Sequence, residues 1–188
     1  MRLIIIGVIL LLASAANAAT VVLDFEEFTP MTYPSTYPSL QSQGFDLSTE
    51  AGFGVHPDGD GGYNSQWLAY CGNCTTTLQS QTGAAFSLES VDLFLPAVSV
   101  PADFQITGYY AGGGTIAVDL TLDQNVLSYE FDPAWSNLDQ VVFGTASGSL
   151  FFHGVDNITV SAVPVPAAAW LFGSALAGLG WIRRKQVS

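Results

Sequence analysis

The sequence predicts an all-β domain built as a two-sheet sandwich, with a different kind of segment at each end. Short stretches in which apolar and polar residues alternate recur along the middle of the chain, and alternation is the pattern of a strand with one buried face. Glycine and proline separate these stretches, and no long stretch has the helical period. The two ends depart from this pattern because each contains an uncharged apolar run.

The first residues have the layout of a secretory signal peptide. A basic start at residues 1–2 precedes an apolar run at residues 3–12, and residues 16–18 read Ala-Asn-Ala, which is a small-x-small cleavage site. A membrane anchor or an N-terminal core helix is the alternative, but the run is short for a membrane span. We therefore expect residues 1–18 to be a signal peptide.

Strand patterns follow in chain order. The clearest ones are at residues 21–25, 86–95, 103–110, 115–122 and 150–160. Apolar residues occupy alternate positions from Ile116 to Leu122, and polar residues or alanine occupy the others. The run that begins at Phe86 changes phase after Leu88, which predicts a β-bulge or a bend between two sheets. Short strands joined by turns favour a sandwich, and residues 19–162 are numerous enough to bury a core.

The charged residues are divided between the middle and the ends of the chain. All sixteen Asp and Glu residues lie between Asp24 and Asp156, whereas the four basic residues are Arg2 and the run at 183–185. Phosphate binding requires basic side chains, so this sequence is not expected to bind nucleic acid. The same argument disfavours electrostatic docking of the middle of the chain on anionic lipid.

The C-terminal apolar run predicts a transmembrane helix. Residues 166–182 carry no charge, and as a helix they would extend about 25 Å, enough for a thin bilayer. Trp170 and Trp181 lie near the two ends of the run, where interfacial aromatic residues are found. Three basic residues follow directly: Arg183, Arg184 and Lys185. A buried helix of a soluble domain is the alternative, but such a basic cluster is typical of a cytoplasmic flank.

Residues 163–188 resemble a known sorting signal. The motif consists of Val163, Pro164, Val165 and Pro166, and the apolar run and the basic tail follow it. This arrangement resembles the PEP-CTERM sorting signal in its VPLPA-type variant, although the type motif has Pro-Glu-Pro at this place. The resemblance implies anchoring in the inner membrane before processing by an exosortase, a membrane protease. It also implies final delivery to the cell surface or extracellular matrix of a Gram-negative bacterium that makes exopolysaccharide.

A second resemblance concerns the predicted sandwich. It rests on four parts of the chain: residues 86–93, 106–115, 141–144 and 154–160. These stretches resemble a galactose-binding-type jelly roll, a fold that many carbohydrate-binding modules share. The resemblance implies a jelly-roll-like β-sandwich, in which a structural calcium ion is often held between the first and last strands.

Asp156 is the candidate metal ligand with the clearest physical argument. By alternation it shares a face with Ile158 and Val160, and a buried carboxylate is costly unless it is hydrogen-bonded, metal-bound or protonated. The domain contains no Lys or Arg to pair with it, so all three solutions stay open. The jelly-roll resemblance makes Asp24 and Glu26 its natural partners, and calcium accepts such oxygen ligands. The alternative is that Asp156 starts a turn in which Asn157 points outward, without a metal.

Cys71 and Cys74 form a C-x-x-C pair, which we interpret as a local disulfide because the chain is expected to be exported. A redox motif would need a βαβ setting, which the sequence lacks. A zinc site that adds His56 and His153 does not have a standard ligand spacing.

The acidic loop at residues 56–62 is interpreted as a turn rather than a calcium loop, because no Glu follows at the required position.

Three aromatic residues are candidates for stacking on sugar rings: Tyr109, Tyr110 and Trp135. The two tyrosines precede a glycine-rich hairpin, and Trp135 lies in a predicted loop. We therefore expect Trp135 to be more exposed than Trp67, which we place in the core. Large aromatic residues are most often core residues, and this is the alternative for all of them.

The terminal segments predict an exported protein, and the two resemblances imply an envelope or matrix protein that associates with exopolysaccharide through carbohydrate binding, and not an enzyme. The alternative is a secreted hydrolase of polysaccharides. A hydrolase would need two carboxylates that face one cleft about 5–10 Å apart, whereas a binding module needs an exposed aromatic platform. The sequence contains no G-x-S-x-G motif.

Overall fold

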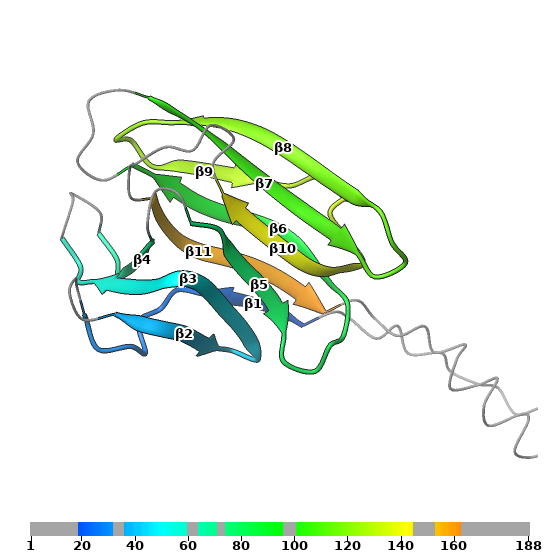
Figure 1. The fold of residues 1–188 in the computed structure, drawn as a ribbon, viewed down its shortest axis with the longest axis horizontal. Helices are drawn as coiled ribbons and strands as arrows, with labels where there is room; N and C mark the ends of the chain where they lie inside the picture. Colours follow the sequence, from blue (N-terminus) through cyan, green and yellow to red (C-terminus); the bar gives the residue numbers. More distant parts are fainter. Residues whose placement is uncertain are drawn as a thin grey trace, which may run out of the picture. The chain divides into compact units, whose positions relative to one another are not determined.

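A computed structural model describes residues 19–31, 36–59, 64–70, 74–95, 101–144 and 153–162. The strands of this part of the chain (Figure 1) are β1 (Thr20–Leu23), β2 (Tyr37–Ser42), β3 (Phe45–His56), β4 (Trp67–Tyr70), β5 (Thr76–Ser80), β6 (Phe86–Phe94), β7 (Ala102–Tyr110), β8 (Thr115–Leu122), β9 (Leu127–Glu130), β10 (Leu138–Gly144) and β11 (His153–Ala162). None of the described residues is helical, which confirms the predicted all-β class.

The predicted terminal segments lie outside this part of the chain. The signal peptide, the sorting motif with its membrane helix, and the basic tail therefore stay predictions. Among the described residues, the structure has no helix with the length and apolar character needed to cross a membrane.

The strands form one antiparallel sheet that folds over on itself. Its order is β8-β7-β10-β5-β3-β4-β11-β6-β9, with β1 added to β11 and β2 added to β3. The first half of β3 pairs with β2 and β5, and its second half pairs with β4. Leu138 of β10 also pairs with Phe86 of β6, so strands that are far apart in this order meet again. The result is a two-layer sandwich (Figure 1).

Gly52 lies in β3, between the half that pairs with β5 and the half that pairs with β4. Its φ angle is +82°, and a Cβ atom built there would lie 2.6 Å from Oγ1 of Thr36. Because side chains are rarely accepted in such a conformation, glycine is the residue that this position requires.

The core lies between the two layers, and alternation places its side chains there. Phe104 and Ile106 of β7 and Phe143 of β10 are fully buried on one side, and Leu93 and Val155 are fully buried on the other. The predicted alternation in β8 is confirmed: residues 116, 118 and 120 pack against the core, whereas residues 115, 117, 119 and 121 are exposed.

The predicted phase change in β6 is also confirmed. Leu88 and Val91 are both in the core, and the pairing of β6 with β11 shifts register between Asp156 and Thr159. The shift corrects one prediction about β11. Val155 and Ile158 are three positions apart and both reach the core, so the strand contains an extra residue between them. Asp156 therefore lies on the opposite face from both, and the prediction that it shares a face with Ile158 is wrong.

Candidate functional site

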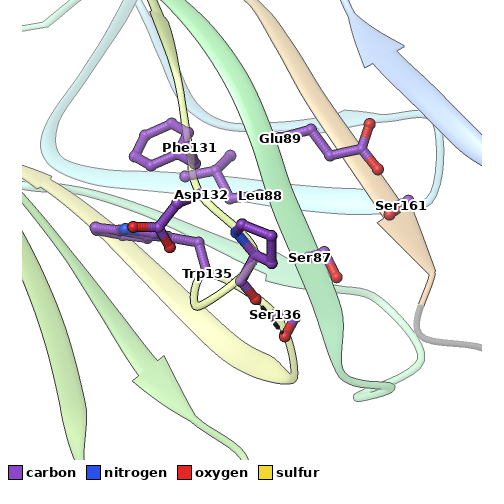
Figure 2. Close-up of a pocket in the computed structure, with 9 residues that line it drawn as sticks. Ser87, Leu88, Glu89, Phe131, Asp132, Trp135, Ser136 and Ser161 are labelled. Carbon is purple, nitrogen blue, oxygen red and sulfur yellow. Dashed lines mark hydrogen bonds between the residues drawn. The ribbon is translucent and has the colours of Figure 1, made fainter.

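A depression of about 340 Å³ lies beside β6, and we call it the β6 pocket (Figure 2). Its walls come from β6, from β11 and from the loop that joins β9 to β10. The lining residues are Ser87, Leu88, Glu89, Phe131, Asp132, Pro133, Trp135, Ser136 and Ser161.

Backbone hydrogen bonds fix the loop against the edge of β6. The N–H of Phe131 donates to the carbonyl of Glu89 at 2.9 Å, and the N–H of Leu88 donates to the carbonyl of Trp135 at 3.0 Å. A turn within the loop is closed by the N–H of Trp135, which donates to the carbonyl of Asp132 at 3.0 Å. The loop therefore extends the sheet, although its sequence shows no strand pattern.

The sequence of the turn explains its shape. Asp132 is followed by Pro133, whose fixed φ angle suits the second position of such a turn. The carboxylate of Asp132 also accepts a hydrogen bond from the N–H of Ala134 at 2.7 Å. Ser136 donates to the carbonyl of Pro133 at 2.9 Å. These bonds hold the rim of the β6 pocket in one conformation.

The aromatic wall of the pocket is also part of the core. Trp135 is only 4% exposed, and its ring lies 4.6 Å from that of Phe131 between centroids. The prediction that Trp135 is more exposed than Trp67 is therefore wrong, since both are buried. The loop bonds to β6 turn the indole inward, where it buries a large apolar area.

The polar groups of the pocket project from the outer face of the sheet. Ser87 and Ser161 are opposite one another in the pairing of β6 with β11, and Glu89 follows Ser87 on the same face. In Figure 2 the carboxylate of Glu89 lies on the side of Ser161, whereas the carboxylate of Asp132 lies on the side of Trp135. The two carboxylates of the pocket thus point apart.

The two predicted tyrosines do not join Trp135 in one platform. Tyr109 is 39% exposed on the outer face of β7. Tyr110 packs against the core, and its hydroxyl donates to the carbonyl of Ala134 at 3.0 Å. Successive residues of a strand point to opposite faces, so Tyr110 supports the loop of the β6 pocket while Tyr109 faces away from it.

The face that carries Tyr109 is a second candidate surface, which the sequence did not reveal. It is the outer face of β8, β7, β10, β5, the first half of β3, and β2, and we call it the open face. One row across it, in register, reads Thr115, Tyr109, Gln140, Gln79, Asp46 and Gln41. Strand order places these residues side by side, and strand order cannot be derived from alternation alone.

The three predicted calcium ligands have different surroundings. The carboxylate of Glu26 accepts hydrogen bonds from the N–H of Gln66 at 2.9 Å, from its Nε2 at 3.0 Å and from the hydroxyl of Ser65 at 3.0 Å. These bonds, first that of the Gln66 backbone, hold the pKa of Glu26 below its usual value. Asp24 accepts a bond from the N–H of Glu26 at 3.4 Å, whereas Asp156 is fully buried.

No group of three or more His, Cys, Asp or Glu side chains in the described part of the chain is arranged to hold a metal ion. The described residues therefore add no support for a calcium site, which stays a prediction.

The two histidines of the zinc alternative, and Cys74, have their own surroundings. His153 is buried against Phe104, with 5.1 Å between ring centroids, and burial lowers the pKa of His153 to about 4. His56 stacks on Trp67 at 4.1 Å. Cys74 is buried, but Cys71 lies outside the described residues, so the disulfide stays a prediction.

Comparisons with known proteins bear on the fold. No protein-family model matches the sequence, and no curated protein matches it. Among solved structures, a carbohydrate-binding module of family 29 is similar, with a TM-score of 0.50 and 14% identity over 77% of this chain and 89% of that chain. A mutant family 29 module complexed with cellulohexaose has a TM-score of 0.51 and 14% identity, over 78% and 93% of the two chains.

This similarity shows the fold. The chain has the β-sandwich architecture of these modules, which confirms the predicted jelly-roll-like sandwich. At 14% identity the similarity does not carry a ligand across.

Proposed function

We propose that residues 19–162 form a non-catalytic carbohydrate-binding domain that holds a glycan in the β6 pocket. The observation that carries this proposal is the composition of the pocket. Half-buried Phe131 and exposed Pro133 supply an apolar wall that buried Trp135 backs, and serine hydroxyls and carboxylates stand around it. Sugars present apolar C–H faces and hydroxyl groups together, and a site of this mixed kind suits both.

The arrangement of the carboxylates favours binding over hydrolysis. Glycoside hydrolysis uses two carboxyl groups that flank one bond. In the pocket, Glu89 and Asp132 point apart, and Asp132 accepts a hydrogen bond within its own turn. The similarity to family 29 modules, one of them complexed with cellulohexaose, supports the same choice.

The terminal segments supply the cellular setting of the proposal. The signal peptide and the sorting signal would export the domain and anchor it in the inner membrane. Exosortase processing would then deliver it to the surface or the matrix, where exopolysaccharide is the expected partner. We also propose that the domain holds a structural calcium ion. The resemblance to a jelly roll is the support for this part of the proposal.

A glycan array probed with the full chain in mild detergent tests the proposal, followed by titration of the best glycan. Ser87→Tyr places a large ring in the pocket, and we expect it to weaken binding about tenfold or more, which is at least about 1.4 kcal/mol. Ser128→Tyr makes the same exchange on exposed β9, outside the pocket, and should bind as the wild type does. Absence of binding to every glycan, or equal loss in both variants, would refute the proposal.

A further inference from the structure

The open face is wide, exposed and free of basic residues. Its six strands span about 24 Å at the usual strand spacing of about 4.8 Å. Its outward side chains are mainly Thr, Ser, Gln and Asp, and those of Thr115, Gln79, Ser48 and Gln41 are exposed. A surface of this width and polarity suits an extended chain better than a single small molecule.

Carboxylates are distributed over this face. They belong to Asp46, Glu50, Asp103, Asp119 and, in the bulge of β10, Asp139. Gln105 donates to Asp119 at 2.8 Å, and Gln81 donates to Asp46 at 3.1 Å, so two of the carboxylates are held in place by neutral amides. Since residues 19–162 contain no Lys or Arg, the negative charge of the face is not neutralised within the domain.

Tyr109 adds an aromatic surface among these charges. Its register partners are Thr115 and Gln140, and the bulge that contains exposed Asp139 lies directly beside this pair. An exposed aromatic face attracts cations and stacks on apolar ring surfaces. Tyr109 and the carboxylates together therefore favour a ligand that is both cationic and built of rings.

We propose that the open face binds a polysaccharide with protonated amino groups, that is, a polymer of incompletely acetylated amino sugars. The ammonium groups pair with the carboxylates, one sugar ring stacks on Tyr109, and Gln140 and Gln79 hydrogen-bond the hydroxyls. Anionic polysaccharides are repelled by the same charges. This surface is separate from the β6 pocket, and the inference does not rest on the function proposed for that pocket.

The first test compares three probes by titration calorimetry of the full chain in mild detergent at mildly acidic pH. Chitosan oligosaccharides carry amines, fully acetylated chitin oligosaccharides do not, and polylysine carries amines without sugar rings. We expect chitosan to bind about tenfold more tightly than either of the others, and added salt to weaken its binding. Equal binding of chitin overturns the role of the amines, and equal binding of polylysine overturns the role of the sugar.

Matched double variants test whether chitosan binds at the open face. Asp103→Asn with Asp119→Asn should weaken chitosan binding about fivefold, whereas Asp58→Asn with Glu130→Gln removes the same charge elsewhere and should have little effect. Equal losses in the two double variants would show that net charge, and not the open face, is responsible, and would overturn the proposal.

Single variants test the stacking on Tyr109 and separate the open face from the β6 pocket. Tyr109→Ala should weaken chitosan binding about threefold, and exposed Val126→Ala should not. An unchanged affinity in Tyr109→Ala would contradict the stacking. Ser87→Tyr in the β6 pocket should leave chitosan binding intact, so failure of one site is distinguishable from failure of the other.

Discussion

At the scale of single residues, His153 makes the stability of the domain depend on pH. Burial against Phe104 lowers the pKa of His153 from 6.5 to about 4. Between these values the unfolded chain binds a proton that the folded chain does not. The free energy of unfolding is therefore not reduced by His153 above pH 6.5. It falls as the pH drops towards 4, by up to about 3 kcal/mol.

Urea unfolding at a series of pH values measures this loss. His153→Met replaces the imidazole by an apolar side chain of similar size that cannot titrate, so the stability of the variant should change much less between pH 6.5 and 4. Parallel losses in the wild type and the variant would contradict the role of His153. Glu26 also loses stabilising hydrogen bonds in acid, but that loss begins only as the pH falls through the ordinary carboxyl pKa of 4.5, so it overlaps the His153 range only at its acidic end.

Gly154 is a second residue whose environment fixes its identity. A Cβ atom there would lie 2.4 Å from Cζ of Phe94, and that ring packs on Trp67 at 4.9 Å. We expect Gly154→Ala to destabilise the fold by about 1–3 kcal/mol, because the ring has to move within a packed cluster. Gly112→Ala, with nothing within 4 Å, is the matched control for urea unfolding. Recovery of stability in Gly154→Ala with Phe94→Leu would identify the ring as the cause.

Residue-level prediction succeeded where burial follows from strand alternation. Alternation in β8 correctly separated the packed residues 116, 118 and 120 from the exposed ones, whereas Asp156 is buried on the opposite face from the one that alternation predicted, because the register of β11 shifts beside it. The burial of Trp135 was not expected, because its loop has no periodic pattern and is held by bonds to β6, which is distant in sequence. The direction of a side chain in a loop depends on such contacts, and a local pattern does not contain them.

At the scale of elements, the 131–137 loop depends on one carboxylate. Asp132 accepts the N–H of Ala134, and the loop in turn positions Trp135 and the rim of the β6 pocket. We expect Asp132→Ala to destabilise the domain by about 1 kcal/mol and to weaken glycan binding, whereas Asp132→Asn should retain much of both. Thermal unfolding and glycan titration of the two variants measure this. Equal effects of the Ala and Asn variants would contradict the role of the Asp132 side chain as a hydrogen-bond acceptor in the turn.

Strands with clear alternation were predictable, whereas β2, β3, β4, β5 and β9, and the neighbours of all the strands, were not. Alternation identified β8 in full, and the phase change in β6 predicted its bulge. The pairing of β5 with both β3 and β10 joins segments that are far apart in the chain. Because the open face exists only through these pairings, it could not be derived from any local stretch of sequence.

At the scale of the whole molecule, the distribution of charge sets the response to salt. The domain contains sixteen Asp and Glu residues and no Lys or Arg, so the folded state holds many like charges close together. Salt screens this repulsion, and we expect sodium chloride to stabilise the fold by about 1 kcal/mol, a rise of about 2–4 °C in Tm. Asp58→Asn with Glu130→Gln should show a smaller rise, because both side chains are exposed and fewer charges remain to be screened.

Calcium can be separated from screening by the same measurement. Magnesium and calcium at equal ionic strength screen the carboxylates alike, so any rise in Tm with calcium beyond that with magnesium reports specific binding. The calcium prediction for Asp24, Glu26 and Asp156 requires such an extra rise, and it requires that Asp24→Asn remove it. Identical melting curves with the two ions would leave screening as the full account of how divalent cations act on this acidic domain.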